Sequence, residues 1–139
     1  MPITTNTGYA GRQFLQAGSS AEKALNYSRA IRDGNWIFVS NTSGYHYDEN
    51  RLDPDVESQA RQMVANVTNV LRCAGACPQD IVRIVIHCPD AADLPKVRGT
   101  LADFLANIRP TATIVCTPLA TPDLKIEMEV TARLASVGA

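Results

Sequence analysis

The sequence lacks a long apolar segment and lacks an excess of charge of either sign. No apolar run approaches the roughly 18 residues of a membrane-spanning helix, and the first residues have neither the basic start nor the apolar core of a secretory signal. Thirteen basic and fourteen acidic side chains give a net charge of −1, whereas binding to nucleic acid or anionic membranes depends on basic side chains. These absences predict a cytosolic protein with neither a nucleic-acid nor a membrane partner.

The chain also lacks the residue spacings of a metal or redox centre. Cys73 and Cys77 are separated by three residues, which is neither a CxxC redox motif nor half of a common zinc motif. The two histidines, His46 and His87, have no carboxylate at ligand spacing. We therefore predict no metal and no cofactor, and we interpret the cysteines as structural thiols.

Neither an internal repeat nor a linker rich in proline, glycine or serine divides the chain. Its 139 residues suit one domain, residues 1–139, because domains run to roughly 100 to 200 residues. Hydrophobic residues make up 45% of the chain and charged residues 19%, which is typical of a globular protein.

Two helices are predicted. Asp53 is a candidate N-cap and Pro54 suits a first helical position, while Gly75 is a natural terminator of the helix that follows them. A second helix is expected over residues 94–106, before the Arg109-Pro110 break. The first helix has one apolar face, formed by Val56, Ala60, Met63, Val64, Val67 and Leu71.

Strands are predicted from β-branched or alternating segments, and Asp33-Gly34 is a candidate two-residue hairpin turn of type I′. Residues 43–52 are polar and aromatic, which predicts a loop. The predicted strands are 12–15, 27–32, 35–42, 81–88, 111–116 and 125–134.

The last predicted strand alternates without exception between apolar and polar residues, so one face is expected in the core and the other carries Glu127 and Glu129. The order of elements predicts an α+β domain with two helices on one face of a mixed sheet. The uncovered face must then meet solvent or another subunit, and its polar row is a candidate location for a site.

Three segments carry a family resemblance that runs from about Tyr27 to Arg133. Residues 26–30 and 34–40 (NYSRA and GNWIFVS) resemble "PYSQAV…GDFIFVSG", and residues 59–83 resemble "QTRQ…N…VLEAAG…DVVK". Residues 125–130 (KIEMEV) resemble "KIEIEA". These are motifs of the RidA/YjgF family, the reactive intermediate deaminases, so the chain resembles a member of that family.

The resemblance implies a chorismate-mutase-like domain with a mainly antiparallel sheet. It further implies a homotrimer around a central barrel, with a small-molecule pocket at each subunit interface. The best-known members hydrolyse enamines or imines to a 2-oxo acid and ammonia without metal or cofactor. Such a reaction needs an anchor for the substrate carboxylate and a group that positions or deprotonates water.

The family's motifs assign roles to particular residues of this chain. Glu127 matches the glutamate usually given the water-handling role, and Tyr27 matches a tyrosine that lines the pocket. Ala112 stands where the family motif "PARS" has the carboxylate-binding arginine. Asn41 replaces the glycine after "VS", and Arg98 aligns with a pocket asparagine.

The missing arginine changes the expected substrate. An alanine cannot replace a bidentate guanidinium clamp, and an unpaired carboxylate in a partly buried site costs several kcal/mol. We therefore expect a substrate without the usual 2-imino carboxylate, or one held by Arg98 or by another arginine such as Arg29 or Arg109. His46, in the predicted loop, is a further candidate pocket residue that could act as acid or base.

Two functions remain open from the sequence. The first is an enzyme that hydrolyses or tautomerises an imine or enamine at a trimer interface, with Glu127 moving the proton. The alternative is a non-catalytic trimer that binds or sequesters a small metabolite. A nuclease role, which has also been attributed to the family, is disfavoured by the net charge of −1.

Overall fold

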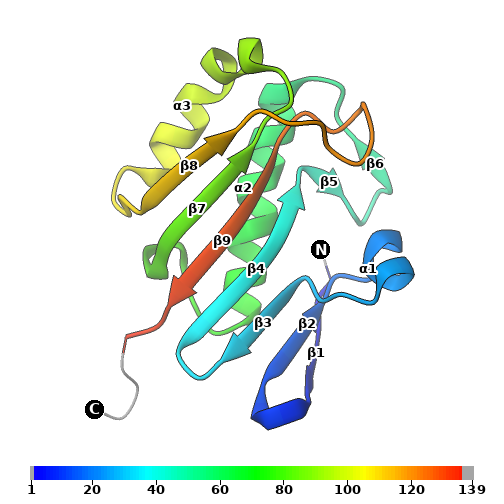
Figure 1. Ribbon diagram of the computed structural model, residues 1–139, viewed down its shortest axis with the longest axis vertical. Helices are drawn as coiled ribbons and strands as arrows, with labels where there is room; N and C mark the ends of the chain where they lie inside the picture. Colours follow the sequence, from blue (N-terminus) through cyan, green and yellow to red (C-terminus); the bar gives the residue numbers. More distant parts are fainter. Residues whose placement is uncertain (1, 136–139) are drawn as a thin grey trace.

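The computed structural model describes residues 2–135 as a twisted sheet with helices against one face (Figure 1). The helices are α1 (Ser20–Leu25), α2 (Val56–Cys73) and α3 (Leu94–Leu105), with short 3-10 turns η1 (Tyr9–Gly11), η2 (Pro78–Asp80) and η3 (Ala91–Asp93). The strands are β1 (Thr4–Thr7), β2 (Gln13–Gln16), β3 (Ala30–Asp33), β4 (Trp36–Ser43), β5 (Tyr45–His46), β6 (Arg51–Leu52), β7 (Ile81–His87), β8 (Thr111–Val115) and β9 (Glu127–Arg133).

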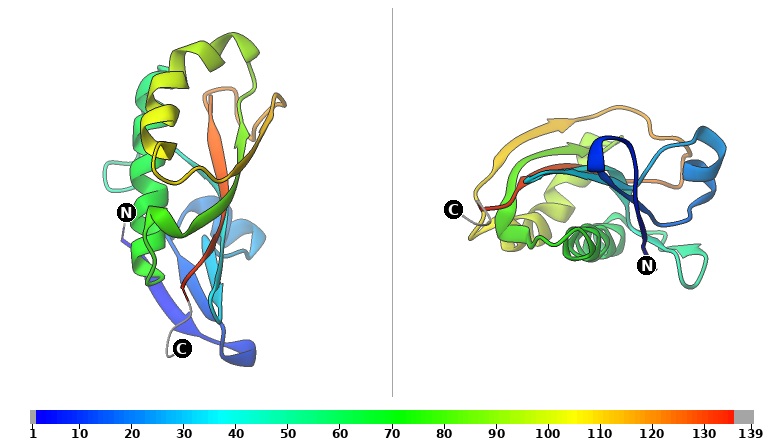
Figure 2. Two further views of the ribbon diagram at one scale, coloured as in Figure 1. Left: turned by 90° about the vertical axis from the view of Figure 1, so that its left-hand side faces the viewer. Right: turned by 90° about the horizontal axis from the view of Figure 1, so that it is seen from below.

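Seven strands form one sheet in the order β1-β2-β3-β4-β9-β7-β8, and β5 pairs with β6 in a separate ribbon. Every neighbouring pair in the large sheet is antiparallel except β7 and β8, which are parallel. Helix α2 packs against β4 and β9, and α3 packs beside α2 on the same face (Figure 2). The predicted α+β fold with a mainly antiparallel sheet and two helices on one face is confirmed.

The regular alternation of β9 is confirmed and it orients the candidate site. Met128 and Val130 are buried in the core beneath α2, together with Met63 and Val67 of that helix. Glu127, at the start of the strand, has the opposite parity and lies opposite Ser43 of β4 and His87 of β7. A residue between two buried neighbours points to the other face of a sheet, so Glu127 lies on the face that α2 and α3 leave uncovered.

Helix α2 begins two residues later than the sequence predicted. Its N-cap is Asp55, whose side chain accepts a hydrogen bond from the backbone N–H of Ser58 at 2.9 Å. The predicted cap, Asp53, pairs with His46 instead, at 2.7 Å. Aspartate is a favoured N-cap residue at either position. Because the side chain of Asp53 is engaged by His46, Asp55 is the one that caps the helix. Gly75 follows the helix with φ +87°, as its predicted role as terminator requires.

The hairpin between β3 and β4 is present, but its turn is shifted by one residue. Asp33 still pairs with Trp36, so the turn residues are Gly34 and Asn35. Gly34 alone of the two has positive φ, +60°, which fits a type II′ turn with glycine first rather than the predicted type I′. Asp33 is the last residue of β3. Its side chain accepts a hydrogen bond at 3.0 Å from Arg12, the residue before β2.

Three strands and one helix were not predicted. Strand β1 pairs with β2 at the edge of the sheet, and residues 43–52, predicted as a loop, contain the β5–β6 ribbon. Helix α1 precedes a strand that was expected to begin at Tyr27 and begins at Ala30 instead. The chain leaves α1 through Asn26 in a left-handed conformation, φ 59°, so Tyr27 lies outside the sheet.

Among residues 2–135, no helix combines the length and apolarity that crossing a membrane requires.

Candidate active site

A cavity of about 810 Å³ lies beside the end of β4 and the start of β9. Helix α1, the β5–β6 ribbon and the segment before β9 gather around this end of the sheet, on the right of Figure 1. The cavity is lined by Pro2, Ala17, Gly18, Ser19, Ser20, Ala21, Leu25, Tyr27, Arg29, Ser40, Asn41, Ser43, Tyr45, Tyr47, Asn50, Leu52, Ala120, Thr121, Asp123, Leu124 and Glu127. We call it the α1–β4 cavity.

Glu127 is the carboxylate of this cavity that the sequence had singled out. Its Oε2 accepts a hydrogen bond from Nδ2 of Asn41 at 2.7 Å. Burial raises the pKa of Glu127 above its usual range, and the positive charge of Arg29 opposes part of that effect. A carboxyl group with a raised pKa exchanges protons nearer to neutral pH than an exposed glutamate does, which suits general acid–base chemistry.

Asn41 reaches Glu127 because β4 is irregular at this point. The register between β4 and β9 shifts between Val39 and Thr42, and a bulge of this kind re-aims a side chain at a strand end. The Oδ1 atom of Asn41 lies 3.0 Å from Nδ1 of His87 on β7. The bulge therefore places one amide between a carboxylate and an imidazole.

Arg29 is buried in the cavity wall and is only 3% exposed. Its Nη2 donates to Oε2 of Glu22, also 3% exposed, at 3.2 Å. Its Nη1 donates to the carbonyl of Asn41 at 2.6 Å and to Oγ1 of Thr42 at 3.3 Å. The guanidinium lies over the ring of Tyr27, 5.6 Å from the ring centroid. These contacts fix the bulge of β4, helix α1 and Tyr27 relative to one another.

Glu22 balances the charge of Arg29. Burial alone would raise the pKa of Glu22, but hydrogen bonds from Ser19 and the N–H of Ala17, together with the charge of Arg29, outweigh it and hold this pKa below its usual value. Both terminal nitrogens of Arg29 already donate to protein groups, and its buried Nε has no hydrogen-bond partner among the described residues. Arg29 is therefore part of the wall rather than a free anion clamp.

Three tyrosines give the cavity flat surfaces. Tyr45 and Tyr47 meet edge to face, with ring centroids 5.3 Å apart, and the Tyr45 hydroxyl donates to Oδ1 of Asn50. Burial raises the pKa of Tyr47, opposed in part by Arg29, so its hydroxyl stays a neutral donor. Together with Tyr27, these rings offer apolar faces and neutral polar groups to a small ligand.

The structure brings four of the candidate residues, Tyr27, Arg29, Asn41 and Glu127, to one cavity. His46 lies outside its lining and pairs with Asp53 at 2.7 Å; Arg51 also donates to Asp53, at 2.6 Å. These two partners lower the pKa of Asp53, with the hydrogen bond from His46 the larger effect.

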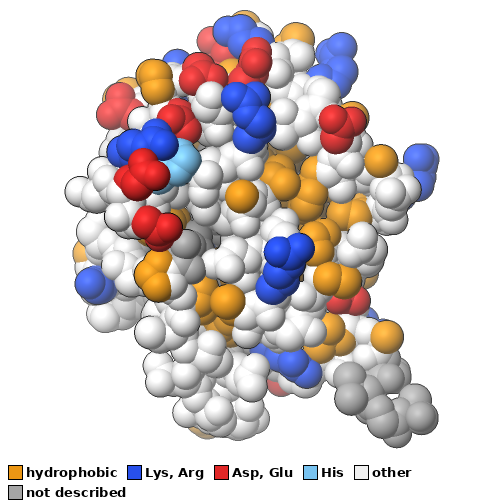
Figure 3. All heavy atoms as spheres, turned by 180° about the vertical axis from the view of Figure 1, so that it is seen from behind, with side chains coloured by type: hydrophobic (Ala, Val, Ile, Leu, Met, Phe, Trp, Pro, Cys, Tyr) orange, Lys and Arg blue, Asp and Glu red, His pale blue; other side chains and the backbone are white. Residues whose placement is uncertain are grey.

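Acidic and basic side chains are intermingled on the helix-covered face of the molecule (Figure 3).

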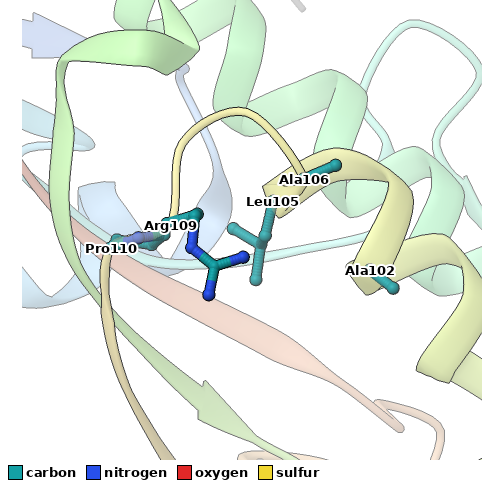
Figure 4. Close-up of a pocket in the computed structure, with 5 residues that line it drawn as sticks. All are labelled: Ala102, Leu105, Ala106, Arg109 and Pro110. Atoms are coloured by element: carbon teal, nitrogen blue, oxygen red, sulfur yellow. The ribbon is translucent and has the colours of Figure 1, made fainter.

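Arg98 and Ala112 also lie outside the α1–β4 cavity of this chain. Arg98 is exposed on α3, and Ala112 is exposed on the edge strand β8 beside Ile84. Arg109 lines a second hollow, of about 340 Å³, at the end of α3, where its side chain extends beside Leu105 (Figure 4). This hollow shares no residue with the α1–β4 cavity.

The sequence did not predict helix α1 or the hydrogen-bond partners that build the wall of the α1–β4 cavity. Ser19 and Glu22 form a capping box, and the Ser-x-x-Glu pattern in the sequence is the signal that could have located α1. For His87, nothing in its own segment of the sequence indicates Asn41 as its partner. Among residues 2–135, no group of three or more His, Cys, Asp and Glu side chains is placed to hold a metal ion.

Comparison with known proteins gives consistent matches. A family model described as Endoribonuclease L-PSP matches residues 18–134. The chain is 30% identical to the chloroplastic Reactive Intermediate Deaminase A of Arabidopsis thaliana, over 78% of this chain and 58% of that protein. It is 23% identical to the 2-iminobutanoate/2-iminopropanoate deaminase of Dermatophagoides farinae, over 74% of this chain and 81% of that protein.

A solved structure from Mycobacterium tuberculosis, described as a member of the YjgF/YER057c/UK114 family, superposes on this chain with a TM-score of 0.80. The two sequences are 31% identical, and the match covers 88% of this chain and 99% of that one. The residues outside the family model at the start of the chain include β1 and β2, so these strands extend the sheet beyond the matched region.

Proposed function

The chain belongs to the RidA/YjgF family, whose sequence model is described as Endoribonuclease L-PSP, and we propose that it is a cofactor-independent enzyme that hydrolyses an imine or enamine. In the hydrolysis of an imine, the oxygen of water bonds to the imine carbon and the C–N bond breaks. One carbonyl compound and one ammonia leave, and the protons of water end on nitrogen. An enamine enters the same reaction after a proton moves to carbon.

The observation that carries this proposal is the placement of Glu127 in the α1–β4 cavity. Its carboxylate takes a proton from the attacking water and later delivers a proton to the leaving nitrogen. The raised pKa of Glu127 suits both steps, because a group that serves as base and then as acid works best when its pKa is near the working pH. The same carboxylate would also serve in moving a proton during tautomerisation.

The charges of the wall support a substrate without a carboxylate. Arg29 is the only basic residue among the described residues that line the cavity, and Glu22 and the backbone of Asn41 already occupy its terminal donors. Asp123 and Glu127 add negative charge to the lining. A neutral imine that rests against the tyrosine rings fits this wall better than an anion does.

We place the working site in a homotrimer in the cytosol. The sheet face without helix cover exposes large apolar side chains, with Trp36 43% exposed and Phe38 50% exposed. Burying such side chains against other copies of the chain would stabilise a closed assembly. A neighbouring copy would then complete the open side of the α1–β4 cavity.

The test compares two imines that differ in the carboxylate. An amino-acid oxidase acting on alanine generates 2-iminopropanoate, and a flavin amine oxidase acting on ethylamine generates the corresponding imine without the carboxylate. Semicarbazide traps whatever imine the protein leaves, so hydrolysis by the protein lowers semicarbazone formation. We expect faster turnover of the imine that lacks the carboxylate.

The outcomes separate the candidate functions. A preference for 2-iminopropanoate would contradict the substrate class that we propose. Saturable binding of either imine with no turnover would contradict catalysis and favour the metabolite-binding alternative. Cleavage of RNA by the same preparation that is abolished in Glu127→Gln would contradict the assignment to imine chemistry.

A further inference from the structure

Three polar side chains form a hydrogen-bonded row across three neighbouring strands. Asn41 of β4 donates through Nδ2 to Oε2 of Glu127 on β9 at 2.7 Å, and its Oδ1 lies 3.0 Å from Nδ1 of His87 on β7. Strand β9 lies between β4 and β7 in the sheet (Figure 1). Glu127 and His87 are direct partners in the β7–β9 register, so their side chains leave the sheet on the same face.

The chemistry of the three groups fixes the direction of each hydrogen bond. An ionised carboxylate only accepts, so the NH₂ group of Asn41 must face Glu127. The carbonyl oxygen of the same amide then faces His87, and it also only accepts. Nδ1 of His87 must therefore carry the proton, and in the neutral ring Nε2 is left unprotonated.

A separate contact holds the backbone of Asn41. Nη1 of the buried Arg29 donates to the Asn41 carbonyl at 2.6 Å, and Glu22 pairs with Nη2 of the same guanidinium. The amide group of Asn41 can still rotate about its own side-chain bonds. Among the described residues, its Oδ1 has a hydrogen-bond partner in His87, so His87 and Glu127 together fix which end of the amide faces the carboxylate.

We propose that His87 is a positioning residue whose Nδ1–H orients the amide of Asn41, which in turn holds Oε2 of Glu127 and leaves Oε1 for proton transfer in the α1–β4 cavity. This role rests on the proposed function, because Glu127, the carboxylate that His87 would help to position, is the residue to which that function assigns catalysis. Oε1 of Glu127 accepts no hydrogen bond from the residues that the structure describes. Misplacing a reacting group by about 1 Å can cost on the order of a hundredfold in rate, so such support matters.

Three substitutions at position 87 separate positioning from direct catalysis. In His87→Asn the side-chain NH₂ stands near the place of Nδ1 and can still donate to Asn41. In His87→Gln the amide reaches the place of Nε2 instead, and His87→Phe keeps a ring but has no donor. If His87 positions Asn41, only His87→Asn should retain activity. If His87 itself exchanges protons, none of the three variants should retain it.

The first measurement does not depend on turnover. Long-range ¹H–¹⁵N spectra of the ¹⁵N-labelled protein, recorded above the pH at which the ring is charged, report which ring nitrogen carries the proton. We expect the Nδ1–H form for His87, and a shift of the Asn41 side-chain NH₂ signals in His87→Phe that is largely reversed in His87→Asn. The Nε2–H form, or Asn41 signals that do not respond to His87→Phe, would overturn the proposal.

The second measurement uses the imine without the carboxylate. His87→Phe and His87→Gln are expected to lower kcat by about tenfold to a hundredfold with KM changed by less than about threefold, and His87→Asn to stay within about threefold of the wild type. Glu129→Gln, on the same face but ion-paired with Arg83, is the matched control and should leave kcat unchanged. Equal loss in all three variants would overturn positioning in favour of direct catalysis.

The two measurements keep the failures distinguishable. Absence of turnover in the wild type would contradict the proposed function, and the spectra would still decide whether His87 orients Asn41. A variant that fails to fold is recognised by its thermal transition. In that case the ring nitrogen that carries the proton in wild-type His87 tests the proposal without the variant.

Discussion

At the scale of single residues, Glu127 and Arg29 carry opposite charges in one wall, and their surroundings give them different roles. Arg29 is neutralised by Glu22 and its terminal donors hold protein groups. Glu127 receives a hydrogen bond from Asn41 on one oxygen, and burial raises its pKa. The arginine therefore holds the wall together, and the carboxylate is the group that remains available for chemistry.

Glu127→Gln should change the pH dependence of stability. Burial holds the folded-state pKa of Glu127 above its usual value, so its favourable contribution is complete below the unfolded pKa and is lost as pH rises through the folded pKa. Glutamine does not titrate. Urea unfolding at several pH values should therefore show the variant gaining stability relative to the wild type as pH rises above the usual pKa of a glutamate. A difference that is constant or falls with pH would contradict the raised pKa.

Glu22→Gln should be strongly destabilising. The substitution leaves the Arg29 guanidinium buried without its counter-charge, and removing one partner of a buried pair costs about 3–5 kcal/mol in the free energy of unfolding. Asp33→Asn is the matched control, because it breaks the exposed pair with Arg12 and should cost less than about 1 kcal/mol. Equal losses in urea unfolding would show that the Glu22–Arg29 pair does not hold the wall.

At the scale of elements, the site depends on how closely the end of β4 approaches α2. Gly44 follows β4, and a Cβ built at this position would overlap the backbone carbonyl of Gln59 in the helix. Asn66 of the same helix donates to the carbonyls of Ser43 and Tyr45 at 3.0 and 2.9 Å. These contacts fix the direction in which the chain leaves the sheet and begins the tyrosine-bearing wall.

Gly44→Ala and Gly99→Ala should have opposite effects. At Gly44 the added methyl group meets helix backbone that cannot move aside, so we expect a loss of several kcal/mol, at or above the 1–3 kcal/mol typical of overpacking. Gly99 lies in α3 with nothing within 4 Å of an added Cβ, and alanine there should stabilise by about 0.5–1 kcal/mol. Thermal unfolding of both variants checks this. A tolerated alanine at position 44 would contradict the close approach.

The sequence predicted those elements in which local pattern and tertiary environment agree. The alternation of β9 placed Glu127 opposite the core, and the apolar face of α2 located that helix to within two residues. The bulge in β4 was not predicted, because it depends on pairing with β9, and Asn41 has its partners only through that bulge. The burial of Arg29 could not be inferred either, since arginine is ordinarily exposed and its counter-charge lies on a helix that was missed.

At the scale of the whole molecule, the sheet face without helix cover is the surface on which the proposed assembly would form. On that face of β4, Trp36 is 43% exposed and Phe38 is 50% exposed. Apolar side chains on a face without helix cover are stabilised when another subunit covers them. In the proposed homotrimer, a neighbouring copy would add a wall to the α1–β4 cavity.

The predicted assembly is a homotrimer with three times the 15.0 kDa mass of the chain. Light scattering coupled to size exclusion should give a mass of about 45 kDa, and Phe38→Glu should shift it toward the monomer by placing a charge in the apolar face. Thr7→Glu on the exposed strand β1 is the control and should leave the mass unchanged. A wild-type monomer would contradict a site completed between subunits.

The most direct test of the central claim is the turnover number of Glu127→Gln on the imine without a carboxylate, measured beside Glu129→Gln. The substitution keeps the size of the side chain and the hydrogen bond from Asn41 but removes the group that exchanges protons. We predict that kcat falls by about a hundredfold to ten-thousandfold while the imine still binds, and that Glu129→Gln keeps the wild-type rate. A Glu127→Gln protein that turns over at the wild-type rate would contradict the assignment of catalysis to this carboxylate.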